Sequence, residues 1–491
     1  MSLRLGTRNL TKRFGSFTAV SEVSLSFEPG LIHAVLGENG AGKSTLMKLL
    51  FGLHHPTSGE ILVNGEPVEW RSSMDSIRRG LGMVQQHFTL VEPLSAIDNI
   101  MLGAEVASGL GRLGRAAAIK RIEALLPSRS LAVPWLMPVE KMTVGQKQRV
   151  EILKLLFRES KILFLDEPTA VLTPSEIDEF FDVLRELKKQ GRTIVLITHK
   201  INEVLQLCDT YTILRQGRMV GAGRVADSSA DQIIEMMIGK KLPEFDFVRP
   251  PAGADLALEC RNVSGIDLQV RSGEIVGVAG VEGSGQSQFV DALMGLRDFD
   301  GEMKLHGEKI EPRQTELVRR SGLGLVPEDR HHQGLWLDQS CHDNMVIGLE
   351  SRFIKNAVFQ RSMLVDTTAK WAREFDVRSA NLDVPVGALS GGNQQKVIFA
   401  REVTGRKPRF LICHQPTRGV DLGAIDLIHR KLMELRNDGL GILVLSSELD
   451  ELLKICDRLY VFFNGKVSAC FERSQFDRMK IGAAMTGAQN A

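Results

Sequence analysis

The feature that most constrains this chain is a glycine-rich phosphate-binding pattern that occurs twice. The first copy, residues 37–44, matches G-x-x-x-x-G-K-[ST] in full. The second copy, residues 280–287, keeps the glycines but carries Gln286 where the first has Lys43. In such a loop the glycines let backbone N–H groups approach an anion at a helix N-terminus, and the lysine reaches the terminal phosphates. The two copies are therefore predicted to differ in what they can hold.

Further short motifs also occur twice, at nearly the same separation in sequence as the two glycine-rich patterns. This separation is too long for a solenoid repeat and is typical of whole domains fused in tandem. We expect a first domain over residues 1–240, a polar, proline-bearing linker over 241–254 and a second domain over 255–491. In each domain a short apolar run, residues 31–36 and 275–279, leads directly into the glycine loop. Such runs are typical of buried parallel strands.

The first domain contains further signals of an α/β fold. Residues 162–165 and 193–197 read as buried parallel strands. Between them a helix is predicted, with Thr173 as its cap, Pro174 at its first position, Glu176 in a capping box and one apolar stripe formed by Ile177, Phe180, Phe181, Leu184 and Leu187.

Each domain should also contain antiparallel strands. Asn64-Gly65 and Asn464-Gly465 are typical of tight hairpin turns. Residues 95–140 show less pattern and are expected to form a helical insertion.

The composition bears on three questions: nucleic-acid binding, membrane association and the state of the cysteines. The 491 residues carry 61 Lys and Arg against 60 Asp and Glu, so a net charge of +1 gives no global basic field that would favour nucleic acid. No apolar stretch of about 18 residues occurs, so any membrane role is expected to be peripheral. Six cysteines without C-x-x-C spacing, with Cys208 and Cys456 at equivalent places, are interpreted as reduced core residues.

Two adjacent carboxylates follow the strand at 162–165. Asp166 is expected to hold Mg²⁺ through its water shell, with Ser44 as a direct oxygen ligand. Glu167 is placed to accept a proton from an attacking water. Adjacent acids after a strand are often only a solvated turn, but the complete phosphate loop upstream favours the catalytic interpretation.

Three more residues are weaker candidates. His199 ends the strand at 193–197 and is a candidate sensor of a γ-phosphate, although a hydrogen-bonded structural histidine is the alternative. Gln86 could reach the metal or the water from a loop, or belong to plain surface loop. Phe14 could stack on adenine, or be a core aromatic.

Two further short segments, one in each predicted domain, have similar sequences. Residues 389–393 read Leu-Ser-Gly-Gly-Asn, residues 142–146 read Met-Thr-Val-Gly-Gln, and each precedes a predicted helix. With these segments the chain resembles a tandem ATP-binding-cassette (ABC) ATPase over essentially its whole length. The resemblance implies an α/β fold of two tandem P-loop NTPase domains, each with a parallel-sheet core, an antiparallel β subdomain and a helical insertion.

In that family cassettes meet head to tail, so each ATP lies between the P-loop of one and the signature of the other. The first site would then be complete. Its catalytic residues would be Glu167, His199 and Gln86, and its Mg²⁺ would be held by Ser44, Gln86 and Asp166. Its ATP-binding residues would be Gly37, Glu38, Asn39, Gly40, Ala41, Gly42, Lys43, Ser44, Thr45 and Phe14, with Ser390, Gly391 and Gly392 from the other domain.

The second site would be degenerate. His414 and Gln415 stand where Asp166 and Glu167 stand in the first copy, and Glu328 occupies the position of Gln86. Its facing signature has Val144 where a glycine is expected. We predict that it does not hydrolyse ATP, and its occupancy by nucleotide stays open. The residues concerned are Gly280, Gly283, Gly285, Gln286, Ser287, His414, Gln415 and Ser447.

The tandem layout and the segments 326–330 and 416–421 resemble the ATPase subunit of bacterial carbohydrate-uptake importers of the ribose, galactose or nucleoside type. Residues 86–93 and 415–417 look more like the nucleoside type. The resemblance implies two transmembrane permease subunits, an extracytoplasmic solute-binding protein, peripheral attachment at the cytoplasmic face of the inner membrane and no nucleic-acid partner. The alternative is a soluble twin-cassette ATPase acting on ribosomes or nucleic acid, which usually has two intact sites and a long charged linker.

Overall fold

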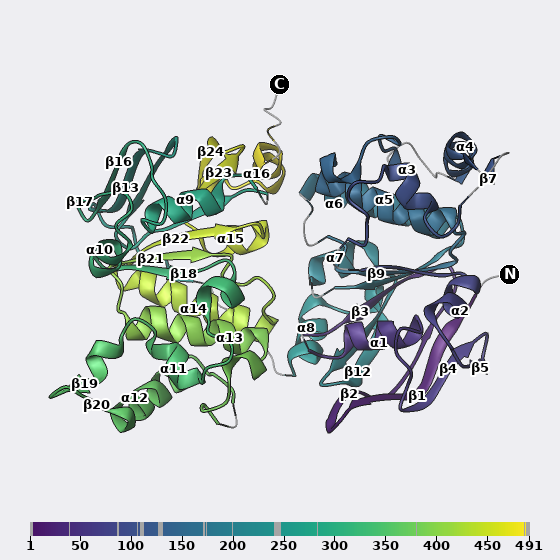
Figure 1. The fold of residues 1–491 in the computed structure, drawn as a ribbon, viewed down its shortest axis with the longest axis horizontal. Helices are drawn as coiled ribbons and strands as arrows, with labels where there is room; N and C mark the ends of the chain where they lie inside the picture. The colour runs from purple at the N-terminus through teal and green to yellow at the C-terminus, as the bar shows by residue number, and fades with distance from the viewer. Residues whose placement is uncertain are drawn as a thin grey trace. The chain divides into compact units, whose positions relative to one another are not determined.

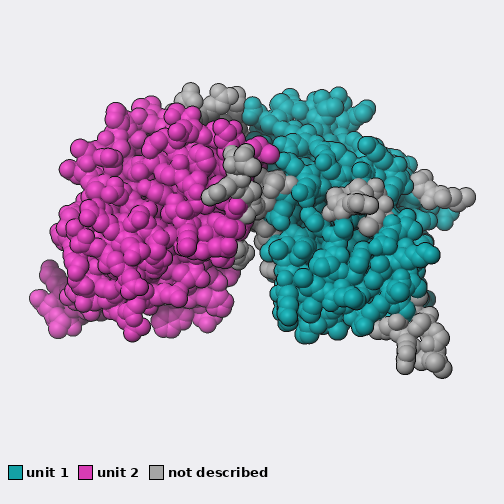
Figure 2. All heavy atoms as spheres, turned by 90° about the horizontal axis from the view of Figure 1, so that it is seen from above, with its two compact units in different colours: residues 1–243 teal, residues 244–491 magenta. Residues whose placement is uncertain are grey.

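The computed structural model describes residues 3–38, 40–85, 88–105, 107–108, 112–125, 131–169, 172, 174–198, 200–239, 247–281, 283–379, 381–485 and 487. The chain divides into two compact units, residues 1–243 and 244–491, which Figure 2 shows in separate colours. The division lies inside the segment 241–254 that the sequence marks as a linker. Each unit is described by itself.

Unit 1 contains two main sheets. The antiparallel sheet has the order β2-β1-β4-β5 and consists of β1 (Leu5–Phe14), β2 (Phe17–Phe27), β4 (Ser58–Val63) and β5 (Glu66–Val68). The mainly parallel sheet has the order β12-β11-β3-β10-β9-β6 and consists of β3 (Ile32–Leu36), β6 (Leu81–Val84), β9 (Ile162–Asp166), β10 (Thr193–Ile197), β11 (Thr210–Arg215) and β12 (Arg218–Arg224). A short hairpin pairs β7 (Ala107–Ser108) with β8 (Arg112–Leu113).

Helices cover the parallel sheet on both faces, with α5 and α6 on one side and α1 on the other (Figure 1). The helices of unit 1 are α1 (Lys43–Leu50), α2 (Ser73–Arg78), α3 (Ala96–Met101), α4 (Arg115–Leu125), α5 (Val144–Phe157), α6 (Pro174–Lys189), α7 (Ile201–Leu207) and α8 (Ala230–Ile238), with short 3₁₀ turns η3 (Val139–Lys141) and η4 (Val225–Asp227). Coverage on both faces is why the central strands are uniformly apolar.

Unit 2 repeats this arrangement strand for strand. Its antiparallel sheet is β14-β13-β16-β17, formed by β13 (Leu256–Val263), β14 (Ile266–Arg271), β16 (Glu302–Leu305) and β17 (Glu308–Ile310). Its parallel sheet is β18-β21-β22-β15-β23-β24, formed by β15 (Ile275–Ala279), β18 (Leu323–Val326), β21 (Phe410–His414), β22 (Gly441–Ser446), β23 (Arg458–Phe463) and β24 (Lys466–Glu472). A hairpin pairs β19 (Ile354–Lys355) with β20 (Val358–Phe359).

The helical part of unit 2 is also equivalent to that of unit 1. It comprises α9 (Gln286–Leu293), α10 (Thr315–Arg320), α11 (Cys341–Val346), α12 (Arg361–Glu374), α13 (Gly391–Phe399), α14 (Leu422–Asn437), α15 (Leu449–Ile455) and α16 (Arg478–Met485), the π-helical turns η5 (Arg330–Gly334) and η8 (Ala400–Gly405), and the 3₁₀ turns η6 (Glu350–Phe353), η7 (Val386–Ala388) and η9 (Arg473–Gln475). No helix in the described part of the chain combines the length and the apolar character needed to cross a bilayer.

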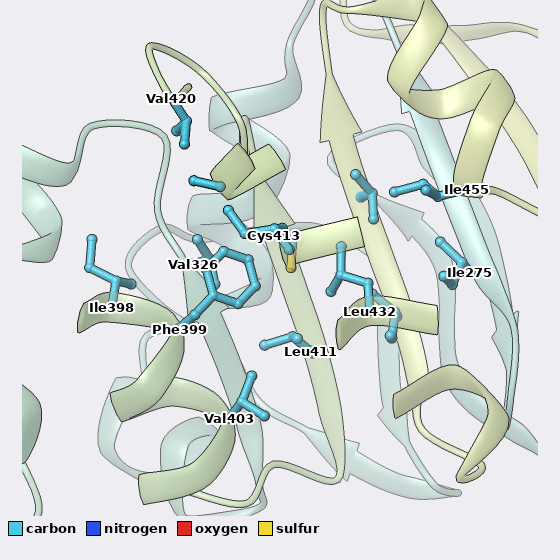
Figure 3. Close-up of a cluster of buried hydrophobic side chains, with 14 of the residues drawn as sticks. Ile275, Val326, Ile398, Phe399, Val403, Leu411, Cys413, Val420, Leu432 and Ile455 are labelled. Atoms are coloured by element: carbon cyan, nitrogen blue, oxygen red, sulfur yellow. The ribbon is translucent and has the colours of Figure 1, made fainter. Parts of the chain in front are cut away.

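The core of unit 2 has two layers because alternate residues of each parallel strand point to opposite faces. Leu411 and Cys413 of β21 belong to the layer beneath α13, α14 and α15, which Figure 3 shows. Phe410 and Ile412 of the same strand belong to the layer beneath α9 and the antiparallel sheet. The register of the strand is therefore fixed by apolar burial on both sides.

The elements predicted from sequence are confirmed. The four predicted strands are β3, β9, β10 and β15, and β9 and β10 pair in parallel. The predicted helix begins at Pro174, although its predicted cap, Thr173, lies outside the described residues. The two Asn-Gly pairs form hairpin turns with positive φ at both residues, as a type I′ turn requires. Cys208 and Cys456 are buried free thiols, whereas Cys470 is exposed and is not the core residue expected from the sequence. Residues 95–140 contain α3 and α4.

A buried ion cluster in unit 2 ties the helical part to the sheet. The Glu402 carboxylate is fully buried and accepts from Arg319 at 2.8 Å, Arg401 at 3.0 Å and Arg406 at 3.2 Å. Burial alone would raise the pKa of Glu402, but the three guanidinium groups outweigh it and hold the pKa below its ordinary value. Arg401 also donates to the carbonyl of Gly334 at 2.8 Å, so the cluster fixes the segment that follows β18.

We predict that Glu402→Gln lowers the stability of unit 2 by about 3 kcal/mol, because it leaves the buried Arg401 and the half-buried Arg319 and Arg406 without their common anion. The matched control is Glu316→Gln, which removes an exposed i,i+4 partner of Arg320 and should leave the unfolding midpoint almost unchanged. Urea unfolding followed by circular dichroism measures both. Since the folded-state pKa of Glu402 is lowered, the wild-type advantage should be present at neutral pH and should fall as the pH drops through that pKa. Equal midpoints for the two variants would contradict this account.

Candidate functional site

The phosphate loop of unit 1 joins β3 to α1 and is shaped by glycines that no other residue can replace. Gly37 has φ 153° and Gly42 has φ 101°. A Cβ atom on Gly37 would lie 2.3 Å from the Leu214 carbonyl, and one on Gly42 would lie 2.4 Å from the Ala19 carbonyl. The loop therefore packs its backbone against neighbouring strands while α1 begins at Lys43. Asn39 lies outside the described residues.

Lys43 is folded back onto this loop. Its Nζ donates to the carbonyls of Gly37 at 2.8 Å and Glu38 at 3.0 Å, and only 6% of the residue is exposed. Burial lowers the pKa of Lys43, while the charges of Glu167, Asp166 and Glu38 act in the opposite direction. The ammonium is thus held beside the two carboxylates that follow β9.

Asp166 is the last residue of β9 and faces the start of α1. Burial and the neighbouring charge of Glu167 raise the pKa of Asp166, while Lys43 and a hydrogen bond from the Ser44 side chain lower it. The structure therefore brings Lys43, Ser44 and Asp166 together, as the sequence predicted for a phosphate and metal site.

Glu167 adopts a left-handed conformation with φ 46°, which turns the chain sharply away from β9. Its N–H donates to the carbonyl of Ile197 at the end of β10 at 2.9 Å. In unit 2 the equivalent residue, Gln415, has φ 51° and donates to the carbonyl of Leu445 at 2.7 Å. The turn is the same in both units although the side chain differs.

The structure describes only some of the other residues predicted for the first site. The Phe14 ring on β1 is 46% exposed, with Lys12 Nζ 5.1 Å from its centroid, so it is not the core aromatic of the alternative interpretation. Gly40, Ala41 and Thr45 lie in the loop and the first turn of α1. Gln86 and His199 lie outside the described residues.

The signature of unit 2 opens α13. Ser390 caps the helix by accepting from the N–H of Asn393 at 3.4 Å. A Cβ atom on Gly391 would lie 2.8 Å from Nη2 of Arg330, and one on Gly392 would lie 2.4 Å from Oδ2 of Asp421. A side chain at Gly391 would also meet the Gly419 carbonyl oxygen at 2.9 Å, whereas a side chain at Gly392 would require the Asp421 carboxylate to move.

The signature of unit 1 has a different surface. Val144 takes the place of Gly391 at the start of α5 and is 37% exposed. Thr143 caps this helix in a box with Gln146. The fold of the segment is kept, but an isopropyl group stands where unit 2 presents bare backbone.

The phosphate loop of unit 2 is similar in shape and different in charge. Gly283 and Gly285 have φ of 87° and 98°, whereas Gly280 has no positive φ. Gln286 is 5% exposed and donates its amide to the Val278 carbonyl at 3.2 Å, so it offers no cation to the loop.

The polar residues near this loop form two groups. Ser287 donates its hydroxyl to Glu328 at 2.9 Å, and His414 Nε2 lies 3.5 Å from the same carboxylate. Burial lowers the pKa of His414, while Glu328 raises it and Arg418 lowers it further. The Gln415 amide oxygen accepts from the N–H of Ser447 at 3.2 Å and from its hydroxyl at 3.3 Å.

A family model described as ABC transporter matches this chain twice, over residues 20–170 and 263–418. The chain belongs to the ABC transporter family. The two matched regions each contain one phosphate loop, so the ABC cassette is present as a tandem repeat. The predicted fold class and the predicted ABC-type ATPase are confirmed.

Relatives extend over nearly the whole chain. It is 40% identical to the nucleoside import ATP-binding protein NupA of Lactococcus lactis subsp. cremoris, over 98% of this chain and 97% of that protein. It is 38% identical to the guanosine import ATP-binding protein NupO of Bacillus subtilis, over 98% and 96%. It is 33% identical to the ribose import ATP-binding protein RbsA of Oceanobacillus iheyensis, over 99% of each chain.

One residue of the first ABC cassette was missed by sequence reasoning. Glu203 on α7 is buried and accepts from the hydroxyls of Thr169 at 2.5 Å and Thr198 at 3.0 Å. These threonines flank residues predicted to be catalytic, because Thr169 lies two positions after Glu167 and Thr198 directly precedes His199. The available signal was the recurrence of an acid at the same place in the second copy, where Glu451 is also buried.

We predict that Glu203→Gln lowers the kcat for ATP hydrolysis about tenfold, because the amide has one acceptor oxygen in place of two and one of the two threonines loses its acceptor on α7. The matched control is Glu451→Gln in unit 2, where the acid contacts Ser446 and His429 instead. It should leave kcat within about twofold. A steady-state phosphate-release assay measures both, and an equal loss in the two variants would show that Glu203 has no special role in the first cassette.

Proposed function

We propose that this chain is the ATP-hydrolysing subunit of an ABC importer that takes up a nucleoside or a simple sugar through partner permeases. The observation that carries the proposal is the unequal pair of phosphate loops. Unit 1 brings together Lys43, Ser44, Asp166 and Glu167, whereas unit 2 has lost the lysine and both acids. This difference supports one hydrolytic site and one degenerate site.

The import role is supported by the relatives. Proteins named for import of nucleosides, guanosine and ribose share 33% to 40% identity with the chain over nearly its full length. Of these three, the two named for nucleoside or guanosine import have the higher identities, and the segments 86–93 and 415–417 also favour the nucleoside type. A nucleoside is therefore the proposed solute, with a pentose or hexose as the second candidate.

We propose that the working ATP site is composite. Its phosphate-binding half would be the loop of unit 1, and its lid would be Ser390, Gly391 and Gly392 of unit 2. The bare backbone at the start of α13 supports this role, because a γ-phosphate could approach its N–H groups closely. The corresponding lid in unit 1 carries Val144, which would hinder the same approach at the degenerate site.

The residues of unit 1 suit the steps of phosphoryl transfer. Lys43 is held only by main-chain carbonyls in the contacts given above, and its ammonium can exchange these acceptors for β- and γ-phosphate oxygens. Glu167 would accept the proton of the attacking water. Gln86 would orient that water, and His199 would contact the γ-phosphate.

The same region fits a magnesium ion. The Ser44 hydroxyl and the Asp166 carboxylate are hard oxygen donors and are already hydrogen-bonded to each other, and Gln86 would add an amide oxygen. When bound, Mg²⁺ would neutralise charge that develops on the phosphates.

The proposed assembly includes two transmembrane permease subunits and an extracytoplasmic solute-binding protein, with this chain attached at the cytoplasmic face of the inner membrane. The alternative is a soluble twin-cassette ATPase on ribosomes or nucleic acid. The loss of the lysine and both acids from unit 2 argues against that class, which usually has two intact sites.

We predict that Glu167→Gln abolishes steady-state ATP hydrolysis, because loss of a positioned base removes about two to four decades of rate. The matched variant is Gln415→Glu, which installs a carboxylate at the equivalent turn of unit 2. In the Glu167→Gln background it should restore little activity, because Lys43 and Asp166 have no counterparts there. A coupled ATPase assay measures both. Substantial turnover by Glu167→Gln alone would refute the assignment of the base.

We predict that the chain isolated from its own cells fractionates with membranes and not with ribosomes, because its partners span the bilayer. Fractionation followed by immunoblotting tests this, with a ribosomal protein as the reference for the alternative class. Recovery of the chain in the ribosomal fraction would favour the soluble twin-cassette ATPase.

A further inference from the structure

Two sequence positions near the degenerate phosphate loop of unit 2 carry a charged and a neutral side chain in the opposite order to unit 1. In unit 1 the strand β9 ends in the carboxylate Asp166, and the neutral Gln86 comes two residues after β6. In unit 2 the strand β21 ends in the neutral His414, and the carboxylate Glu328 comes two residues after β18. In the sequence, each unit therefore has one carboxylate and one neutral group at these two positions, and in unit 2 the carboxylate of Glu328 meets a serine on the first turn of the phosphate helix.

These groups converge in unit 2. Oε2 of Glu328 lies 2.9 Å from the Ser287 hydroxyl and 3.5 Å from Nε2 of His414. Two neighbouring ligands of an octahedral cation at about 2.1 Å lie about 3.0 Å apart. The two distances from Oε2, 2.9 Å and 3.5 Å, are therefore close to the spacing of neighbouring ligands.

His414 has an unsatisfied nitrogen at this point. The residue is 3% exposed, and its Nε2 has no hydrogen-bond partner although it faces Glu328. Buried polar atoms in folded proteins nearly always have a partner, so an unpartnered imidazole nitrogen directed at a carboxylate needs a reason. A neutral imidazole nitrogen is a common metal ligand.

Arg418 does not occupy the converging oxygen. Its Nη1 lies 3.2 Å from Oε1 of Glu328, while Oε2 faces Ser287 and His414. Its side chain is 53% exposed. The guanidinium thus offsets part of the negative charge of Glu328 without closing the space between the other two groups.

We propose that Ser287, Glu328 and His414 form a divalent-cation site at the degenerate phosphate loop of unit 2. The described residues contain no group of three or more His, Cys, Asp or Glu side chains able to hold a metal. The third ligand here is a hydroxyl, and water or nucleotide phosphates would complete the shell. Because one ligand is an imidazole, the site should favour cations such as Mn²⁺ or Zn²⁺ over Mg²⁺ more strongly than an all-oxygen site does.

The site gives the inactive half a role that the proposed function does not assign to it. A cation held without Lys43 or a catalytic acid would retain nucleotide phosphates and not promote their hydrolysis. The proposal depends on the residues of unit 2 alone, and so it stands or falls separately from the assignment of Glu167.

The test uses Mn²⁺ with the untagged full-length chain, with and without the non-hydrolysable analogue AMP-PNP. Electron paramagnetic resonance counts bound Mn²⁺, and electron spin echo modulation detects ¹⁴N of a coordinated imidazole. We expect an imidazole signal in the wild type that is lost in His414→Asn. We also expect Glu328→Gln to weaken Mn²⁺ binding at this site about tenfold or more.

The matched control is Ser44→Ala, which removes the equivalent serine of unit 1 and should leave the imidazole signal intact. Circular dichroism and thermal unfolding establish that each variant is folded, and Glu328→Gln serves as the independent test if His414→Asn is unstable. Absence of the ¹⁴N signal in the wild type under both conditions would overturn the proposal. Its persistence in folded His414→Asn, or unchanged Mn²⁺ affinity in Glu328→Gln, would also overturn it.

Discussion

The constraint on which the functional residues depend is the common carboxyl edge of a parallel sheet that is buried on both faces. In unit 1 the phosphate loop follows β3, the acid pair lies where β9 ends and Thr198 follows β10, so all three arrive at one edge. Because both faces of the central strands β3, β9 and β10 are buried, none of the three can slip by a residue without moving apolar side chains out of the core. Hydrophobic burial thus sets the positions of polar groups that contribute little to it.

At that edge, charge is balanced differently in the two units. In unit 1 the ammonium of Lys43 lies beside Asp166 and Glu167, and each group shifts the pKa of another. In unit 2 the cation of the loop is gone, and the remaining carboxylate, Glu328, is offset from outside by Arg418. In unit 2, Glu328 contacts Ser287, His414 and Arg418. Because these residues form a polar cluster of their own, we interpret them as a different kind of site and not only as a phosphate site that has lost residues.

Local sequence signals predicted the parts of the fold that local physics determines. The apolar runs, the Pro174 helix start, the Asn-Gly turns and the glycine loops all follow from backbone preference and periodicity. The contact of Glu203 with Thr169 and that of Glu402 with Arg319 could not be predicted in this way, because in each pair the two residues lie far apart in sequence. The same holds for the convergence of Ser287, Glu328 and His414, where the residues were noted singly but their meeting depends on three separate elements.

The left-handed turn shared by Glu167 and Gln415 bears on how such a duplicated gene diverges. The turn is held by main-chain bonds to the neighbouring strand, so the backbone keeps its course whichever side chain is present. Codons for glutamine and glutamate differ by a single base, and the same is true of histidine and aspartate. A duplicate can therefore abandon its chemistry by point mutation while its architecture stays intact, and the way back remains short in mutational steps.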